Sequence, residues 1–188
     1  MMSSPQLQIL PVVDKSWSVF LDRDGVINIE KEADYIRNWD EFKFYEGAAD
    51  AIAAISIKVA RVFVVTNQKG VGKMLMSESD LQHIHENMLN AVADAGGRIA
   101  QVYYCTDLND DNYFRKPNPG MGFKARTDFP ETDFNKAIMV GNTMGDMQFG
   151  KTLGMITVFI PSTKPMPLLP HPLVDFVFAD LVSLAKAL

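Results

Sequence analysis

The sequence has one cysteine, Cys105, and no long apolar or basic run among its 188 residues. A single cysteine excludes an intrachain disulfide and favours a reducing, cytoplasmic location. No stretch approaches the roughly 18 apolar residues of a membrane span, and the N-terminus lacks the features of a signal peptide. Because nucleic-acid backbones are bound by clustered Lys and Arg, the net charge of −5 argues against that partner. We therefore expect a soluble protein with no membrane or nucleic-acid partner.

The length and composition indicate one globular domain. With 47% hydrophobic and 22% charged residues the chain is neither disordered nor fibrous, and 188 residues suffice for one substantial core. Pro5 and Pro11 interrupt the first segment twice. We predict a tail or arm over residues 1–16 and a single domain over 17–188.

Short β-branched or aromatic runs alternate with segments of helical period. The strand-like runs are 18–21, 60–66, 100–105, 136–141 and 155–160, with a short strand at 173–178. The helical segments are 46–55, a helix from Ser77 or Ser79 to Gly96, 118–129, 143–154 and 179–188. This alternation predicts an α/β fold, in which a Rossmann-like parallel sheet carries helices on both faces in three layers.

Polar residues follow four of these runs. Because parallel strands end at the same edge of a sheet, the residues after them should meet at one site. The predicted site residues are Asp22, Asp24, Thr66, Asn67, Arg115, Lys116, Asn142 and Asp146.

Two of these residues, Asp22 and Asp24, lie two positions apart behind the first strand. Ionised carboxylates about 7 Å apart repel by about 2 kcal/mol at an effective dielectric near 20. A hard cation, most simply Mg²⁺, would offset that repulsion with carboxylate, amide and backbone oxygens as ligands. Gly25 allows the sharp turn that brings the backbone close to such an ion.

Lys116, Arg115 and Thr66 supply the donors that suit a phosphoryl group, and the two cationic side chains should also offset the charge of the aspartate pair. Asp22 could then form an aspartyl phosphate. Asp24 could protonate the leaving oxygen and later activate water.

Four ordered motifs carry a family resemblance: DRDGVIN (22–28), VVTNQKGVGK (64–73), RKPNPGM (115–121) and MVGNTMGD (139–146). Together they resemble the haloacid dehalogenase superfamily of phosphohydrolases, and within it the histidinol phosphate and heptose bisphosphate phosphatase branch. The resemblance covers about residues 19–160 and implies the three-layer α/β fold of that superfamily. We predict no large cap domain, because the spans 28–46 and 105–115 are too short for one.

The resemblance implies a role for each matching residue. Asp22 would be the nucleophile and Asp24 the acid/base. Thr66, Asn67 and Lys116 would bind phosphate or substrate, and Arg115 would contact substrate. Mg²⁺ would be held by Asp22, the Asp24 carbonyl and the fourth motif, in which Asn142 and Asp146 lie.

This chain departs from the family pattern in the fourth motif. Relatives usually carry an aspartate where this chain has Asn142, so a charged metal ligand has become a neutral one. We predict weaker Mg²⁺ binding than in such relatives, with Asp146 compensating directly or through water. Substitution of Asn142 by aspartate should then lower the Mg²⁺ concentration needed for half-maximal activity.

The loop before RKP also departs from the branch, which commonly holds zinc there through C-x-H and C-x-C. Here Cys105 is followed by Asp107, Asn112 and Phe114 at the other three positions. One soft ligand cannot form a structural zinc site, so we predict no zinc and packing by Tyr113 and Phe114 instead.

The substrate implied is a small phosphorylated metabolite. Of the two substrates of the branch, a sugar phosphate such as D-glycero-D-manno-heptose 1,7-bisphosphate is favoured over histidinol phosphate. A third alternative is a catalytically weakened member that binds phosphate or a partner, for which Asn142 is the argument. GVGK (70–73) is not a nucleotide-binding P-loop, because Asn67 and Met74 stand where glycine and Ser or Thr are needed.

Overall fold

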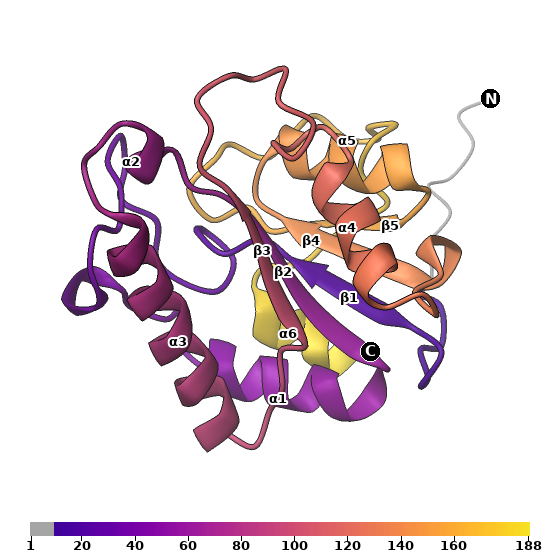
Figure 1. The fold of residues 1–188 in the computed structure, drawn as a ribbon. Coiled ribbons are helices and arrows are strands. Elements are labelled where there is room, and N and C mark those ends of the chain that lie inside the picture. Colours follow the sequence, from indigo (N-terminus) through magenta and orange to yellow (C-terminus); the bar gives the residue numbers. More distant parts are fainter. Residues whose placement is uncertain (1–9) are drawn as a thin grey trace.

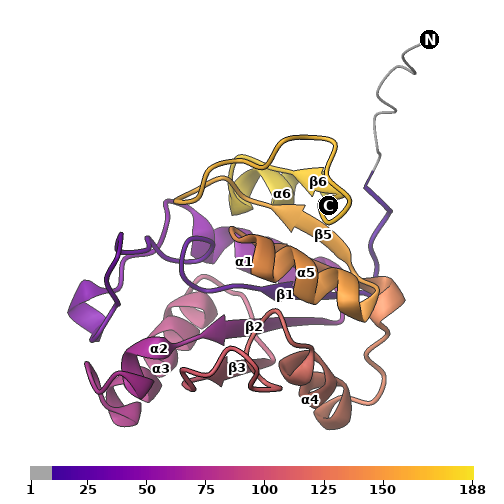
Figure 2. The same ribbon diagram turned by 90° about the horizontal axis from the view of Figure 1, so that it is seen from above.

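Six parallel strands form the central sheet of residues 10–188, the part of the chain that this computed structural model describes (Figure 1). They are β1 (Ser18–Leu21), β2 (Arg61–Asn67), β3 (Gln101–Cys105), β4 (Ala137–Gly141), β5 (Ile156–Phe159) and β6 (Phe176–Val177). The order is β3-β2-β1-β4-β5-β6, and Figure 2 shows the sheet running from β3 at one edge to β6 at the other. β1 and β4 therefore meet at the point where the chain reverses its progress across the sheet. Open parallel sheets bind ligands at such a point, beside the carboxyl ends of the strands.

Helices cover both faces of the sheet, as the sequence predicted. They are α1 (Ala48–Lys58), α2 (Lys69–Gly72), α3 (Glu78–Asp94), α4 (Gly120–Asp128), α5 (Met144–Leu153) and α6 (Leu181–Ala187), with 3₁₀ turns η1 (Trp39–Glu41) and η2 (Phe134–Lys136). In Figure 1, α1, α3 and α6 lie on one side of the sheet, and α4 and α5 lie on the other. Among residues 10–188, no helix is long and apolar enough to span a membrane.

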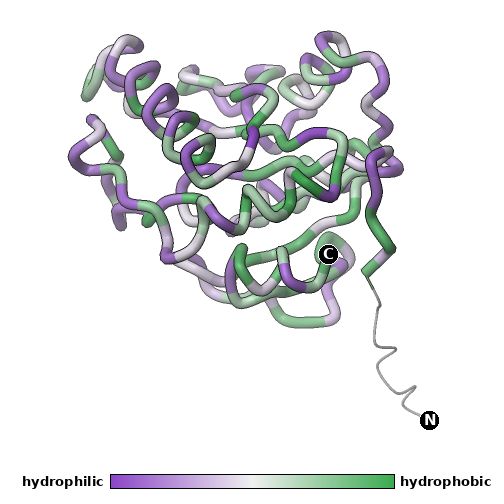
Figure 3. Tube along the Cα trace, turned by 90° about the horizontal axis from the view of Figure 1, so that it is seen from below, coloured by the Kyte–Doolittle hydropathy of each residue, from purple (hydrophilic) through white to green (hydrophobic). Residues whose placement is uncertain are grey.

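Each face of the sheet has its own hydrophobic core. Successive strand residues point to opposite faces, so Leu21 and Val64 pack under α1 and α3 while Phe20 and Phe63 pack under α4 and α5. All four side chains are fully buried, which stabilises the fold by roughly 1.5–3 kcal/mol for each. Figure 3 shows the hydrophobic residues gathered in the central strands.

The structure differs from the predicted elements in detail. Ser77, not Ser79, caps α3 and forms a capping box with Asp80. Residues 69–72, which lie outside every predicted helix and strand, form the short helix α2. The last strand is only two residues long, although backbone bonds from the Asp175 N–H to the Thr157 carbonyl at 3.2 Å and from the Phe178 N–H to the Phe159 carbonyl at 3.1 Å flank it.

Of the predicted arm over residues 1–16, residues 1–9 lie outside the described part of the chain. Residues 10–16 contain no helix or strand. Val13 is nonetheless buried in the core, and the Lys15 ammonium donates to the Val59 carbonyl at 3.0 Å. The end of this segment is therefore attached to the domain.

Candidate active site

A cavity of about 170 Å³ lies at the carboxyl ends of the central strands and opens to solvent. Seven of the eight predicted site residues line it: Asp22, Asp24, Thr66, Asn67, Lys116, Asn142 and Asp146. Four segments that are far apart in the sequence therefore meet at one edge of the sheet, as predicted. Arg115 is not among the residues that line the cavity.

The turn after β1 depends on Gly25. Its φ of +85° lies in the left-handed region that favours glycine, and its N–H donates to the Asn28 carbonyl at 2.8 Å. A Cβ atom at this position would lie 1.9 Å from Asn142 Nδ2. Glycine is therefore required both for the backbone conformation and for the approach of the Asn142 carboxamide.

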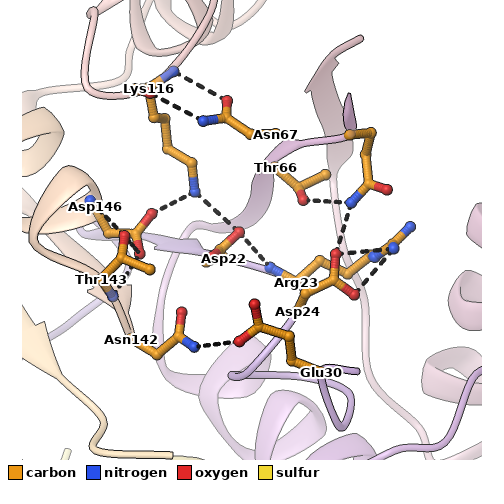
Figure 4. A network of polar contacts seen from close by, with 11 residues as sticks. Asp22, Arg23, Asp24, Glu30, Thr66, Asn67, Lys116, Asn142, Thr143 and Asp146 are labelled. Atoms are coloured by element: carbon orange, nitrogen blue, oxygen red, sulfur yellow. Dashed lines mark hydrogen bonds and ion pairs between the residues drawn. The ribbon is translucent and has the colours of Figure 1, made fainter. Parts of the chain in front are cut away.

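Lys116 lies between two carboxylates (Figure 4). Its ammonium is 2.9 Å from Asp22 Oδ1 and 2.5 Å from Asp146 Oδ1, and its side chain is 3% exposed. The Asn67 carboxamide bonds both backbone polar groups of Lys116: its Nδ2 donates to the Lys116 carbonyl at 2.9 Å, and its Oδ1 accepts from the Lys116 N–H at 3.0 Å. Burial alone would lower the pKa of Lys116, but Asp146 and Asp22 raise it above its ordinary value. The lysine is therefore a fixed positive charge.

Asp22 carries a perturbed carboxyl group. Burial and the nearby charge of Asp146 raise its pKa to about 7, although Lys116 acts in the opposite direction. Its Oδ1 accepts from the Arg23 backbone N–H at 2.8 Å and also faces Lys116. Among the described residues no donor contacts Oδ2, so this oxygen is free to react or to bind a cation.

Asp24 is neutralised by Arg23, and not by Arg115 as the sequence analysis expected. Arg23 Nη2 donates to both Asp24 oxygens at 3.0 Å, and Asn28 and Gln68 donate to them at 2.9 and 2.8 Å. Burial would raise the pKa of Asp24, but the charge of Arg23 and these hydrogen bonds together lower it. In this arrangement Asp24 is an ionised base.

Arg115 is held away from the cavity by the loop that precedes it. Its Nε donates to Asp110 Oδ1 at 2.8 Å, and its Nη1 donates to the Asp107 carbonyl at 3.3 Å. Asp110 is also paired with Lys69 at 3.1 Å. A contact between Arg115 and the substrate stays a prediction. To make it, the Arg115 guanidinium would have to leave Asp110 and bind the substrate instead.

His85 supports Arg23 from helix α3, a role that the sequence analysis did not assign. Arg23 is fully buried, and its Nη1 lies 3.1 Å from His85 Nε2. Because a guanidinium has only donors, Nε2 accepts this bond and the imidazole is neutral. Burial, followed by the charge of Arg23, lowers the pKa of His85 to about 3.

We expect His85→Leu to lower the free energy of unfolding by about 2–3 kcal/mol at pH 7, because it leaves a buried guanidinium N–H without an acceptor. Unfolded His85 binds a proton below about pH 6.5, whereas the folded form excludes it down to about pH 3. The advantage of the wild type over the variant should therefore decrease as the pH falls from 6.5 towards 3. Urea unfolding at several pH values measures this, with the exposed His83→Leu as the control. An advantage that did not depend on pH would contradict the assignment.

The cavity also offers oxygen ligands for a hard cation. The Asn142 side chain is 1% exposed, and its Oδ1 has no hydrogen-bond partner among residues 10–188. A buried oxygen without a donor, beside a free Asp22 oxygen, fits Mg²⁺. No group of three His, Cys, Asp or Glu side chains in the described chain could hold a metal alone, so amide and backbone oxygens are needed as well.

Asp146 is engaged by protein donors on both oxygens. Thr143 donates to Oδ2 from its backbone N–H at 3.0 Å and from its hydroxyl at 2.6 Å, which caps helix α5, while Lys116 faces Oδ1. This arrangement suits a residue that positions Lys116. Direct binding of the cation by Asp146 stays a prediction.

The loop expected to lack zinc is held by side chains. Cys105 Sγ lies 3.9 Å from Asn112 Oδ1. The rings of Tyr113 and Phe114 meet edge to face with centroids 5.5 Å apart, but both side chains are exposed, so the predicted packing of the loop by these two residues is wrong. Asn112 Nδ2 also donates to Asp107 Oδ2 at 2.7 Å. The absence of zinc stays a prediction, which metal analysis of the purified protein would test.

The fold and the site together define a class, the phosphohydrolases built on a three-layer α/β fold. The family model described as "Polynucleotide kinase 3 phosphatase" matches residues 19–184. The chain is 32% identical over 173 residues to D-glycero-beta-D-manno-heptose-1,7-bisphosphate 7-phosphatase of Pseudomonas aeruginosa, covering 90% of this chain and 96% of that one. It is 36% identical over 133 residues to D-glycero-alpha-D-manno-heptose-1,7-bisphosphate 7-phosphatase of Mycobacterium bovis, covering 70% of each.

Solved structures agree with these relatives. The D,D-heptose 1,7-bisphosphate phosphatase of B. bronchiseptica, crystallised with magnesium and phosphate, has a TM-score of 0.79 at 27% identity and covers 90% of this chain and 96% of that one. A haloacid dehalogenase-like (HAD-like) phosphatase of Mesorhizobium loti has a TM-score of 0.74 at 25% identity and covers 96% of this chain and 88% of that one. The chain belongs to the polynucleotide kinase 3 phosphatase family, and the resemblance to the haloacid dehalogenase superfamily is confirmed.

Proposed function

We propose that this protein hydrolyses a phosphate monoester of a small phosphorylated sugar, with D-glycero-D-manno-heptose 1,7-bisphosphate as the first candidate and Mg²⁺ as cofactor. The names of its relatives support the substrate. The magnesium and phosphate found with the B. bronchiseptica protein support the cofactor and the reaction class. A cytoplasmic location is part of the proposal and is supported by the free thiol of Cys105.

The observation that carries the proposal is the position of Lys116 beside a free carboxylate oxygen. The Asp22 carboxylate lies at the end of β1 with its Oδ2 unpartnered in the described chain, and the Lys116 ammonium is 2.9 Å from its Oδ1. A phosphoryl group that approaches Oδ2 therefore meets a buried positive charge. Such preorganised charge stabilises the transferring group in the transition state.

In the proposed mechanism, Asp22 Oδ2 attacks phosphorus, and the bond from phosphorus to the sugar oxygen breaks. The sugar oxygen takes a proton from Asp24 and leaves as an alcohol. Asp24, now ionised, takes a proton from water, and the hydroxide attacks the aspartyl phosphate. Inorganic phosphate leaves, Asp22 is a carboxylate again, and Asp24 carries a proton for the next cycle.

The first step requires a protonated Asp24. Asp24 is held ionised by Arg23, Asn28 and Gln68, so it is ready to act as a base. To act as an acid it must bind a proton and lose one of these donors. Gln68 Nε2 donates to Asp24 Oδ2 at 2.8 Å and to Thr66 Oγ1 at 2.9 Å, so the Thr66 hydroxyl keeps its own proton to donate to a phosphate while Gln68 joins it to Asp24.

The residues that would hold Mg²⁺ are Asp22, the backbone carbonyl of Asp24 and Asn142. When bound, the cation offsets the negative charge of Asp22 and of the phosphoryl group. Thr66 and Lys116 orient the phosphoryl oxygens. Asn67 keeps Lys116 in place through its two backbone hydrogen bonds.

Phosphate release from both anomers of heptose 1,7-bisphosphate, from histidinol phosphate and from p-nitrophenyl phosphate tests the proposal. We expect kcat/KM for one heptose anomer to exceed that for histidinol phosphate at least 10-fold. Chelation of Mg²⁺ should reduce turnover more than 100-fold, and added Mg²⁺ should restore it. A higher kcat/KM for histidinol phosphate would identify that compound, and not the heptose, as the preferred substrate. No Mg²⁺-dependent turnover of any compound would favour a phosphate-binding or partner-binding protein.

A further inference from the structure

The Asn142 carboxamide has a defined orientation. Its Nδ2 donates to Thr163 Oγ1 at 3.0 Å and lies 3.3 Å from Glu30 Oε2. Both acceptors are on one side, so the amide nitrogen is directed there and Oδ1 is directed away from them. Figure 4 shows Oδ1 on the side of the site where Asp22 and Asp146 lie. This is the orientation that offers an oxygen to a cation.

The Glu30 carboxylate also places a negative charge beside Asn142, the position at which relatives usually carry an aspartate. It lines the same cavity as Asp22 and Asn142, and its side chain is 24% exposed. Coulomb energy falls only with the inverse of distance, so a carboxylate one contact behind a neutral ligand still attracts the cation. Residues in this outer layer commonly change metal affinity 10- to 100-fold.

We propose that Glu30 is a positioning residue of the cation site, which orients the Asn142 carboxamide and supplies the negative charge that Asn142 lacks. The inference rests on the proposed function, because it concerns the same cation. Glu30, and not Asp146 as predicted from the sequence, then compensates for the missing charge at Asn142. Both oxygens of Asp146 are already engaged by Thr143 and Lys116.

Glu30 has a second set of contacts, which the test must separate from this role. Its carboxylate accepts from the Thr163 hydroxyl and is 3.3 Å from the Lys164 ammonium, so it also joins its own segment to the loop after β5. The Lys164 side chain is 46% exposed, and such a pair is weakened by solvent. If joining the loop were the whole role, loss of Lys164 would have the same effect as loss of Glu30.

The experiment is titration calorimetry of the metal-free full chain with Mg²⁺, without substrate. We expect Glu30→Gln to weaken Mg²⁺ binding 10- to 100-fold. Glu30→Gln combined with Asn142→Asp moves the charge from one residue to the other, and we expect it to restore affinity to within about 3-fold of the wild type. Glu32→Gln, an exposed acid on the same segment, and Lys164→Met should each stay within 2-fold.

Three results would overturn the inference. One is an affinity of Glu30→Gln within 2-fold of the wild type. Another is a double variant no tighter than Glu30→Gln alone, and a third is a loss of affinity in Lys164→Met equal to that in Glu30→Gln. If the wild type hydrolyses the heptose substrate with Mg²⁺ and one of these results is found, the inference about Glu30 fails alone. Absence of Mg²⁺ binding by the wild type would overturn both proposals.

Discussion

Asp22→Asn should reduce phosphate release by at least about 10³-fold, because a carboxamide cannot form the aspartyl phosphate. The two side chains have nearly the same shape, so the cavity should keep its form. Phosphate release under saturating Mg²⁺ and substrate measures the change in kcat. Asp50→Asn, at an exposed position on α1, is the matched control and should leave kcat unchanged.

The same variant should not unfold more easily than the wild type. Burial and Asp146 raise the pKa of Asp22 to about 7, so above that pH the ionised carboxyl group destabilises the fold when no cation is bound. The neutral carboxamide of the variant removes that cost, while Lys116 keeps Asp146 as its partner. Urea unfolding at pH 8 with a chelator should therefore give an unfolding free energy equal to or above that of the wild type. An inactive variant that is also less stable would indicate damage to the fold instead of loss of a nucleophile.

Lys116→Met should reduce both turnover and stability. The loss of a buried cation beside the transferring phosphoryl group should lower kcat at least about 10²-fold. It also leaves Asp22 and Asp146 buried without a positive partner, and breaking a buried pair in this way costs about 3–5 kcal/mol. Kinetics and urea unfolding of the same preparation measure the two effects.

Two variants separate these effects of Lys116. Lys124→Met removes an exposed lysine that pairs with Asp128 on α4, and it should cost less than about 1 kcal/mol without a change in kcat. Adding Asp146→Asn to Lys116→Met removes one of the unpaired carboxylates, which should recover part of the stability but none of the activity. Recovery of turnover in that double variant would show that Lys116 acts only by neutralising Asp146.

The sequence was sufficient to predict the sheet and the convergence of seven site residues, because strand period and strand ends are local features. Asp22, Thr66 and Asn142 each follow or end a strand-like run, and Lys116 lies in the loop after another; a parallel sheet brings such positions to one edge. The predicted position of Arg115 in the cavity is not found. No sequence pattern predicts that Arg115 pairs with Asp110, because the pair depends on how the loop between them folds.

The contacts that sequence reasoning missed join residues that are far apart along the chain. Arg23 pairs with His85 across 62 positions, and Glu30 meets Asn142 across 112. His85 fits the apolar period of α3, which indicates burial but not a partner. Glu30 lies in an irregular segment without any period. A third contact, between Gln68 and Asp24, could have been expected from the TNQ motif, since Gln68 follows β2 directly.

The central place of β1 in the sheet also determines when the catalytic edge can exist during synthesis. The strand pairs with β2 on one side and with β4 on the other, and the Asp22 N–H donates to the Val140 carbonyl at 2.9 Å. A nascent chain that has reached only β3 has made both aspartates of the first motif but none of β4. Until Val140 and Asp146 emerge, one flank of Asp22, the proposed nucleophile, has no protein beside it. The Asp22 carboxylate is therefore enclosed only after β4 and the start of α5 have been translated.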